Sequence, residues 1–230
     1  MIIKGIQKLS MVDYPGLICT TLFTPGCNMR CPFCHNSSLV LGAQDDSFID
    51  LDELFVFLES RKKKVDAVCL TGGEPLLQSG VAEFLLEVKK MGFKTKLDTN
   101  GTRPTALAKV LEAGGVDYVA MDLKNGPEEY ARTVGLTQFD IAPILQSIDL
   151  LLNGSVDYEF RTTVSATLHT KESLMRAGEL IRGAKRWYLQ AFKPGETVID
   201  QSIKAFSKEE LGTLLPALEG FTKELHLRGI

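Results

Sequence analysis

The chain has 230 residues, of which 44% are hydrophobic, and its 26 Lys and Arg against 29 Asp and Glu leave a formal net charge of −3. The hydrophobic content suffices for a packed core and argues against disorder. The near balance of charge argues against a nucleic-acid binder that works by bulk attraction to phosphates. No apolar stretch approaches the length of a membrane span, and residues 1–10 lack the apolar region of a signal peptide. We therefore expect a globular, cytoplasmic protein that binds neither nucleic acid nor membrane.

Short strand-like runs alternate with helical runs along the chain. The patterns predict strands over residues 17–23, 66–71, 94–99, 117–123, 158–164, 186–191 and 223–228. Apolar residues at helical spacing predict helices over residues 50–64, 80–90, 104–113, 138–152, 171–182 and 207–219. Repeated β–α units imply parallel strands, and there are too few units here for a complete eight-fold barrel. We predict an α/β fold, a partial (β/α)6-type TIM barrel with outer helices, in a single domain over residues 1–230. A flat doubly wound sheet is the alternative.

The cysteines are the most informative residues of the chain. There are five, Cys19, Cys27, Cys31, Cys34 and Cys69. An odd number, unevenly spread, does not indicate a disulfide framework. Cys19 and Cys69 lie in apolar segments, where a buried structural thiol is the ordinary interpretation.

Cys27, Cys31 and Cys34 are spaced i, i+4, i+7, which on a helix would form a buried stripe of thiols. Pro32 argues against that helix, because an interior proline removes a backbone hydrogen bond. A loop that brings three thiols together is typical of a metal site. Zinc with His35 as the fourth ligand is one possibility, but His35 directly follows Cys34, and adjacent side chains rarely bind one small ion together. An iron–sulfur cluster is the better interpretation, since a cubane normally takes four cysteines and three leave one iron open.

The loop over residues 24–36 resembles the signature of the radical S-adenosylmethionine (SAM) superfamily, Cys-x₃-Cys-x₂-Cys with an aromatic residue before the last cysteine. Phe33 fills that place. The resemblance implies one 4Fe–4S cluster on the three cysteines, with SAM as the second cofactor.

A second motif follows the strand predicted at residues 66–71. It consists of Gly72, Gly73, Glu74 and Pro75. The glycines permit a close approach of backbone to a ligand, and the glutamate offers an acceptor for an ammonium group. Alone, this motif is also compatible with a plain turn between a strand and a helix. In the radical SAM superfamily the matching element holds the amino group of the methionine part of SAM.

Polar residues recur at or near the ends of the predicted strands, up to about residue 195. They are Asp98, Asp122, Lys124, Arg161 and Gln190. Any one of them could be a helix cap or a surface charge. In an α/β barrel, however, the carboxyl ends of the strands build the active site. Since residues two apart on a strand share a face, Asp122 and Lys124 can point the same way. We expect a shared pocket that binds the cofactor.

Within the superfamily, the resemblance is closest to the activases of glycyl radical enzymes. Cys34-His-Asn36 matches the end of the cysteine motif that is common in that group. The segments Leu97-Asp-Thr-Asn-Gly101 and Met121-Asp-Leu-Lys124 look like paired motifs of pyruvate formate-lyase activase. The resemblance implies that a monovalent cation binds beside the SAM sulfonium on Asp98, Thr99 and Asp122. It also implies that Lys124 and Arg161 lie near the methionine group of SAM.

Other features resemble the long form of the anaerobic ribonucleoside-triphosphate reductase activating proteins. These are the opening Asp13-Tyr-Pro-Gly16, the length, and the segment Leu189-Gln-Ala-Phe-Lys-Pro-Gly195. The chain departs from pyruvate formate-lyase activase in two places. Gln190 stands where a histidine is expected, and no arginine match follows Gly16. There is no additional cysteine-rich insert, so one cluster is expected.

The resemblance implies a radical SAM oxidoreductase that cleaves SAM reductively and generates a glycyl radical on a partner enzyme. The expected partner is anaerobic ribonucleoside-triphosphate reductase, and the expected electron donor is a flavodoxin or a ferredoxin-type protein. Three alternatives remain open. They are an activase of another glycyl radical enzyme of the pyruvate formate-lyase type, a radical SAM enzyme acting on a small molecule and, more remotely, a zinc-binding module.

Overall fold

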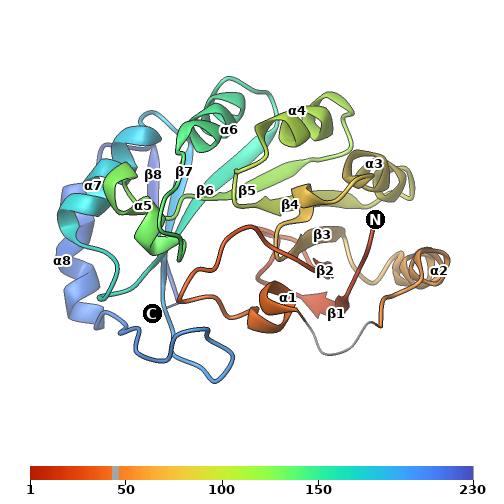
Figure 1. Ribbon diagram of the computed structural model, residues 1–230. Helices are drawn as coiled ribbons and strands as arrows, with labels where there is room; N and C mark the ends of the chain where they lie inside the picture. Colours follow the sequence, from red (N-terminus) through yellow and green to blue (C-terminus); the bar gives the residue numbers. More distant parts are fainter. Residues whose placement is uncertain (43–46, 230) are drawn as a thin grey trace. The chain divides into compact units, whose positions relative to one another are not determined.

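The computed structural model describes residues 1–42 and 47–229, in which strands and helices alternate along the chain (Figure 1). The strands are β1 (Gly5–Ser10), β2 (Cys19–Thr24), β3 (Ala67–Gly72), β4 (Lys94–Thr99), β5 (Tyr118–Asp122), β6 (Asp157–Val164), β7 (Arg186–Ala191) and β8 (Glu224–Arg228). In the sheet they follow one another in the order in which they occur in the chain. The helices are α1 (Ser37–Leu41), α2 (Leu51–Arg61), α3 (Val81–Lys90), α4 (Pro104–Glu112), α5 (Pro127–Thr133), α6 (Ala142–Leu152), α7 (Lys171–Leu180) and α8 (Lys208–Leu218), with a short 3₁₀ helix η1 (Pro75–Leu77).

The chain divides into two compact units. Unit 1 comprises Met1–Asn28, Ser38–Thr99 and Arg103–Ala120, and unit 2 comprises Met29–Ser37, Asn100–Thr102 and Met121–Ile230. The single domain expected over residues 1–230 stays a prediction.

In unit 1, β2, β3 and β4 pair in parallel, whereas β1 pairs antiparallel with β2. Local sequence explains where the helices begin. The carboxylate of Asp50 accepts the N–H groups of Asp52 and Glu53 at the start of α2, and Pro104 occupies the first turn of α4, where its missing N–H costs nothing. Helix α3 buries Val81, Phe84, Leu85 and Val88, the apolar stripe that predicted it.

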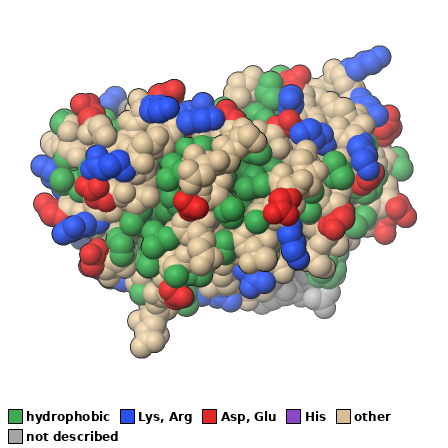
Figure 2. Space-filling model, turned by 90° about the horizontal axis from the view of Figure 1, so that it is seen from above, with side chains coloured by type: hydrophobic (Ala, Val, Ile, Leu, Met, Phe, Trp, Pro, Cys, Tyr) green, Lys and Arg blue, Asp and Glu red, His purple; other side chains and the backbone are tan. Residues whose placement is uncertain are grey.

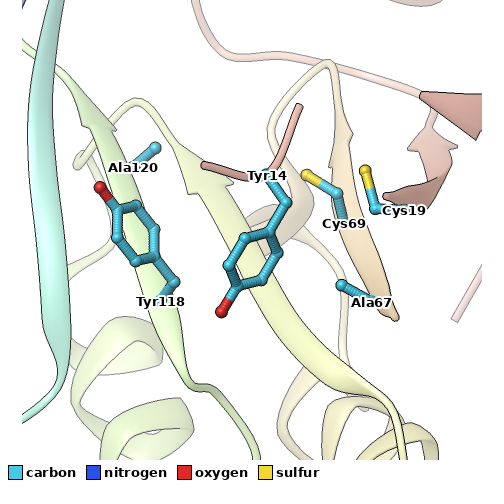
Figure 3. Close-up of a cluster of buried hydrophobic side chains, with 6 residues drawn as sticks. All are labelled: Tyr14, Cys19, Ala67, Cys69, Tyr118 and Ala120. Carbon is cyan, nitrogen blue, oxygen red and sulfur yellow. The ribbon is translucent and has the colours of Figure 1, made fainter. Parts of the chain in front are cut away.

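The interior of unit 1 contains a cluster of buried side chains that includes both strand thiols (Figure 3). Its members are Tyr14, Cys19, Ala67, Cys69, Tyr118 and Ala120, and the rings of Tyr14 and Tyr118 lie 5.7 Å apart. Cys69 and Ala67 share a face because they are two residues apart on β3. Cys19 and Cys69 are fully buried, so the prediction of two buried thiols is confirmed.

In unit 2, β6, β7 and β8 pair in parallel. Capping boxes start α7, through Thr170 and Ser173, and α8, through Ser207 and Glu210; the sequence predicted the second. Trp187 is fully buried in β7, and its indole N–H donates to the hydroxyl of Thr162, 2.9 Å away.

Every strand and helix that the sequence predicted is present, with ends that differ by a few residues. The sequence missed β1, α1 and α5. Strand β1 exposes three residues in a row and so lacks the alternation that marks a half-buried strand, and α1 and α5 are only five and seven residues long. On the face shown in Figure 2, acidic and basic side chains are interspersed, in keeping with the small net charge.

Candidate active site

The central part of the predicted cluster loop lies in unit 2, where backbone bonds hold it. The N–H of Arg30 donates to the carbonyl of Val134 (2.8 Å), and the N–H of Asp200 donates to the carbonyl of Pro32 (2.9 Å). Gly135 lets the backbones approach closely, because a Cβ there would lie 2.1 Å from the carbonyl oxygen of Arg30. The loop is therefore an ordered, non-helical segment, as Pro32 predicted.

The three loop cysteines differ in exposure. Cys31 is buried, whereas Cys27 in unit 1 and Cys34 in unit 2 are partly exposed. The N–H of Cys34 donates to the carbonyl of Cys31 (3.0 Å) and closes a turn between the two thiols. None of the five cysteines, all of them within the described residues, forms a disulfide.

In residues 1–42 and 47–229, no three His, Cys, Asp or Glu side chains surround a position for a single metal ion. A 4Fe–4S cluster makes a different demand, since each thiolate binds its own iron atom. Three thiols on an irregular loop, none of them in a disulfide, are a donor set that fits such a cluster.

His35 takes part in holding the loop. Its Nε2 donates to the carbonyl of Lys193 (2.7 Å), and its ring packs against Phe192 with centroids 5.7 Å apart. A nitrogen that donates a proton to a carbonyl is not a metal ligand. The arrangement therefore disfavours a zinc site that uses Nε2 of His35, and it joins the loop to the segment that ends at Gly195.

In unit 1, the Gly-Gly-Glu-Pro turn is fastened to the start of the cluster loop. The N–H of Gly73 donates to the carbonyl of Thr24 (2.9 Å), and the N–H of Glu74 donates to the carbonyl of Gly26 (2.8 Å). A Cβ on Gly73 would lie 1.9 Å from the carbonyl oxygen of Gly26. Gly72 has φ +131°, and a Cβ there would lie 2.3 Å from backbone atoms of Thr24. Both glycines are therefore needed for this approach of two backbone segments.

The carboxylate of Glu74 is fully buried. Its Oε1 accepts the N–H of Leu76 (3.0 Å) at the start of η1, whose first residue is Pro75, and the hydroxyl of Thr99 (2.8 Å) at the end of β4. The side chain thus ties the turn to the neighbouring strand. Its expected role as an acceptor for the SAM ammonium group stays a prediction.

Asp98 in β4 is bonded to a cationic side chain of the same strand. Its Oδ1 accepts a hydrogen bond from the ammonium group of Lys96, and the thiol of Cys69 donates to the same oxygen (3.8 Å). Lys96 is only 1% exposed. The negative charge of Asp98 is therefore compensated inside unit 1.

Asp122, the last residue of β5, is paired twice in unit 2. Nε of Arg161 donates to its Oδ1 (3.0 Å), and Nζ of Lys124 donates to its Oδ2 (2.9 Å). Burial raises the pKa of this carboxyl, but the charges of Arg161 and Lys124 outweigh that effect and lower the pKa to about 2. The structure thus brings together three of the polar residues that the sequence selected at strand ends.

Lys124 also lies beside the cluster loop. Its Nζ is 5.8 Å from the centroid of the Phe33 ring, a cation–π distance. Burial lowers the pKa of Lys124, but Asp122 and Cys31 outweigh it and raise the pKa above its usual value. Phe33, the aromatic residue of the signature, therefore contacts Lys124, the side chain that the resemblance places near the methionine group of SAM.

His169 is a supporting residue that the sequence did not single out. Its Nδ1 accepts the N–H of Ser165 (3.2 Å), which assigns the proton to Nε2, and Nε2 donates to the carbonyl of Lys124 (2.9 Å). Burial lowers the pKa of His169, in agreement with this neutral form. Its ring lies 6.5 Å from that of Phe33. No local spacing in the sequence indicates these contacts, because they join segments 45 residues apart.

Gln190 lies in β7, with Thr163 of β6 and Arg228 of β8 as its register partners.

The predicted site residues are distributed over the two units. Unit 1 holds Cys27, the Gly72–Pro75 turn, Asp98 and Thr99, and unit 2 holds Phe33, the other two cysteines, Asp122, Lys124, Arg161 and Gln190. The shared pocket and the cofactor-binding roles of these residues stay predictions.

The monovalent cation fits this chain poorly. Such an ion is held by oxygen ligands that carry or share negative charge. Here Asp98 is bonded to Lys96, and Asp122 is bonded to Lys124 and Arg161, each pair within its own unit. Side-chain cations already stand beside both carboxylates.

Comparisons with known proteins agree with the motifs. The family described as the Radical SAM superfamily matches residues 21–182. The chain is 32% identical over 202 residues to a Methanocaldococcus jannaschii protein named as a glycyl-radical enzyme activating enzyme, covering 84% of this chain and 80% of that one. It is 26% identical over 231 residues to the pyruvate formate-lyase-activating enzyme of Clostridium pasteurianum, covering 96% of this chain and 92% of that one.

Among solved structures, Streptococcus suis SuiB bound to its precursor peptide SuiA superposes with a TM-score of 0.70 at 13% identity, covering 91% of this chain and 48% of that one. A likeness at this identity shows the fold. The predicted α/β fold, a partial TIM barrel of the radical SAM type, is confirmed. No helix in the described part of the chain is long and apolar enough to span a membrane.

Proposed function

The chain belongs to the radical SAM superfamily and, within it, to the glycyl-radical-enzyme activating enzymes, and from this premise we propose that its protein substrate is anaerobic ribonucleoside-triphosphate reductase. The family implies one 4Fe–4S cluster and SAM as cofactors. We assign the cluster to Cys27, Cys31 and Cys34, the three thiols of the loop. The observation that carries this assignment is the loop itself, an ordered and non-helical segment whose three thiols form no disulfide.

Cys27, Cys31 and Cys34 would hold the cluster, which would supply one electron for the reductive cleavage of SAM, the chemistry that ends in a radical on a glycine of the partner enzyme. The protein provides binding and orientation for this chemistry. Lys124 and Arg161 supply two positive side chains for the carboxylate of the methionine part of SAM, and Asp122 holds both in place. The ring of Phe33 lies 5.8 Å from the ammonium group of Lys124, within the range of a cation–π contact.

Two segments of the sequence favour the reductase as partner. They are Asp13-Tyr-Pro-Gly16 and residues 189–195, which resemble the reductase activating proteins. The second segment is bonded directly to the cluster loop, since the carbonyl of Lys193 accepts from His35. A feature that separates the two groups of activases therefore contacts the loop.

A second candidate partner is pyruvate formate-lyase. The observation that favours it is the likeness to the Clostridium pasteurianum enzyme, which extends over 96% of this chain. Gln190 and the missing arginine after Gly16 are the two points at which the chain departs from that resemblance. We propose a flavodoxin or a ferredoxin-type protein as electron donor and the cytoplasm as location; the absence of disulfides among the five cysteines, all of them in the described residues, suits a reducing compartment.

The test is an anaerobic activation assay with the reconstituted protein, SAM, a reductant and each candidate partner in turn, read by electron paramagnetic resonance. We expect the doublet of a glycyl radical on anaerobic ribonucleoside-triphosphate reductase. A doublet on pyruvate formate-lyase alone would replace the proposed partner by the second candidate.

Two further outcomes separate the remaining alternatives. SAM cleavage that needs only a small-molecule substrate, with no doublet on either partner, would identify an enzyme that acts on a metabolite. Reconstitution that yields stoichiometric zinc without brown cluster absorption would contradict the cluster assignment. The Cys34→Ser variant is the negative control, because it removes one ligand of the proposed cluster.

A further inference from the structure

We propose that the ammonium group of Lys96 takes the place of the monovalent cation at Asp98, so that SAM binding by this protein does not require Na⁺ or K⁺. The inference rests on the proposed function, since it concerns the residues through which SAM is held. Lys96 would be a positioning residue that acts through Asp98.

The position of Lys96 carries the proposal. Lys96 and Asp98 are two residues apart on β4, so their side chains share a face of the strand. The ammonium group donates to Oδ1 of Asp98 and to Sγ of Cys69, the latter at 3.8 Å. At 1% exposure, this lysine cannot reach water as surface lysines do. Its charge is therefore directed at Asp98 and not at solvent.

The surroundings of Lys96 keep it there. Cys69 belongs to the buried cluster of unit 1, which includes two tyrosine rings, two thiols and two alanines (Figure 3). A buried ammonium group is stable only when it is paired, and Asp98 is its carboxylate partner in the described structure. Asp13, a second acidic residue in this region, accepts the hydroxyl of Thr21 at 2.6 Å.

A compact ammonium group resembles a monovalent metal ion in its charge and in its preference for oxygen. A second cation on the same carboxylate would stand close to the first, where two like charges repel strongly in a low-dielectric interior. Unit 2 repeats the arrangement independently, because Lys124 and Arg161 both donate to Asp122. Each acidic residue that the family resemblance assigns to the ion is thus supplied with a cation by the chain itself.

The test is titration calorimetry of SAM binding to the reconstituted protein at equal ionic strength in potassium, sodium or tetramethylammonium chloride. Tetramethylammonium is too large for a site of this kind. We expect the Kd of the wild-type protein to agree within about twofold in the three salts. In the Lys96→Met variant, we expect a Kd about tenfold weaker in tetramethylammonium chloride and recovery in potassium or sodium chloride, because breaking a buried pair leaves a charge that an ion can compensate.

Two variants serve as controls. Lys96→Arg keeps the positive charge and is expected to remain independent of the salt. Lys94→Met removes an exposed lysine from the same strand, where it pairs with Asp117 (3.2 Å), and is expected to bind SAM as the wild type does.

A wild-type Kd that weakens about tenfold without potassium or sodium would overturn the inference, and this comparison decides even if Lys96→Met fails to fold. A Lys96→Met protein that no salt restores would give Lys96 a purely structural role and overturn it as well. Failure of the wild type to bind SAM in any salt would instead overturn the proposed function, and this inference with it.

Discussion

The cysteine loop and the strand cysteines place the same side chain in different surroundings. Cys19 and Cys69 lie on β2 and β3, where burial raises the pKa of both thiols and keeps them protonated. Cys31 and Cys34 lie on an irregular loop held by backbone bonds, with Lys124 close to Cys31. A thiol binds metal as the thiolate, so the surroundings decide which cysteines are ligands. The regular strands bury both of their thiols completely, whereas the irregular loop leaves Cys27 and Cys34 partly exposed and only Cys31 buried.

The largest effect is expected from the loop cysteines. Cys34→Ser should abolish cluster binding and lower SAM cleavage by about 10³-fold or more, because an alcohol is a poor iron ligand. Iron content, visible absorption and 5′-deoxyadenosine release after anaerobic reconstitution measure this. Cys19→Ser is the matched control and should retain the cluster; if it also loses the cluster, the division of the five cysteines is wrong.

The next effect concerns what holds the loop in place. Gly73→Ala should lower SAM cleavage by about 10²-fold, because the new Cβ would meet the carbonyl oxygen of Gly26 at 1.9 Å and both backbones must move. Gly212→Ala is the control, since no atom lies within 4 Å of a Cβ there and alanine suits a helix. Equal activity of the two variants would show that the close approach is unimportant for function.

A smaller effect is expected in the strand region. Cys69→Ser should lower the free energy of unfolding by about 1–2 kcal/mol, since it places a more polar group in the buried cluster. The amount of iron–sulfur cluster that the protein binds should stay unchanged. Urea unfolding of the apoprotein and iron analysis of the reconstituted protein measure the two quantities, and a loss of iron without a loss of stability would reverse the assignment of Cys69.

The smallest effect is a dependence on alkaline pH. Burial raises the pKa of Cys69 well above its usual value. Above the ordinary thiol pKa the unfolded chain therefore loses this proton while the folded chain keeps it, and stability falls as the pH rises. Between about pH 8 and pH 10 the wild type should lose about 1 kcal/mol more than Cys69→Ser. Urea unfolding at a series of pH values measures this difference. If the two proteins lose stability in parallel, the thiol ionises equally in the folded and the unfolded state, and the prediction is wrong.

The sequence was sufficient for every strand except β1 and for the helices of nine residues or more, whereas the roles of the site residues stay predictions. Strand β7 agrees with the predicted bounds because buried and half-buried residues alternate along most of it. Strand β4 also has the predicted bounds, although Thr95, Lys96 and Leu97 are buried in a row. The cysteine loop was recognised from spacing and from Pro32. These patterns are local: they depend only on residues close together in the chain, so they can be recognised without the tertiary structure.

Contacts between distant segments could not be predicted in this way. His169 supports Lys124, and the carboxylate of Glu74 binds Thr99, through hydrogen bonds that span 45 and 25 residues. The sequence does not distinguish Lys96 from the other lysines of the chain, and only the structure shows that it is buried and paired with Asp98. Sequence reveals which residue types are present, but tertiary packing decides which of them meet.

The central claim is that the protein takes a hydrogen atom from a glycine of a partner enzyme. The most direct measurement uses anaerobic ribonucleoside-triphosphate reductase prepared with α-deuterated glycine and follows both products. The account predicts deuterium in 5′-deoxyadenosine, together with collapse of the glycyl doublet that the unlabelled partner gives. Unlabelled 5′-deoxyadenosine with no radical on the partner would contradict it.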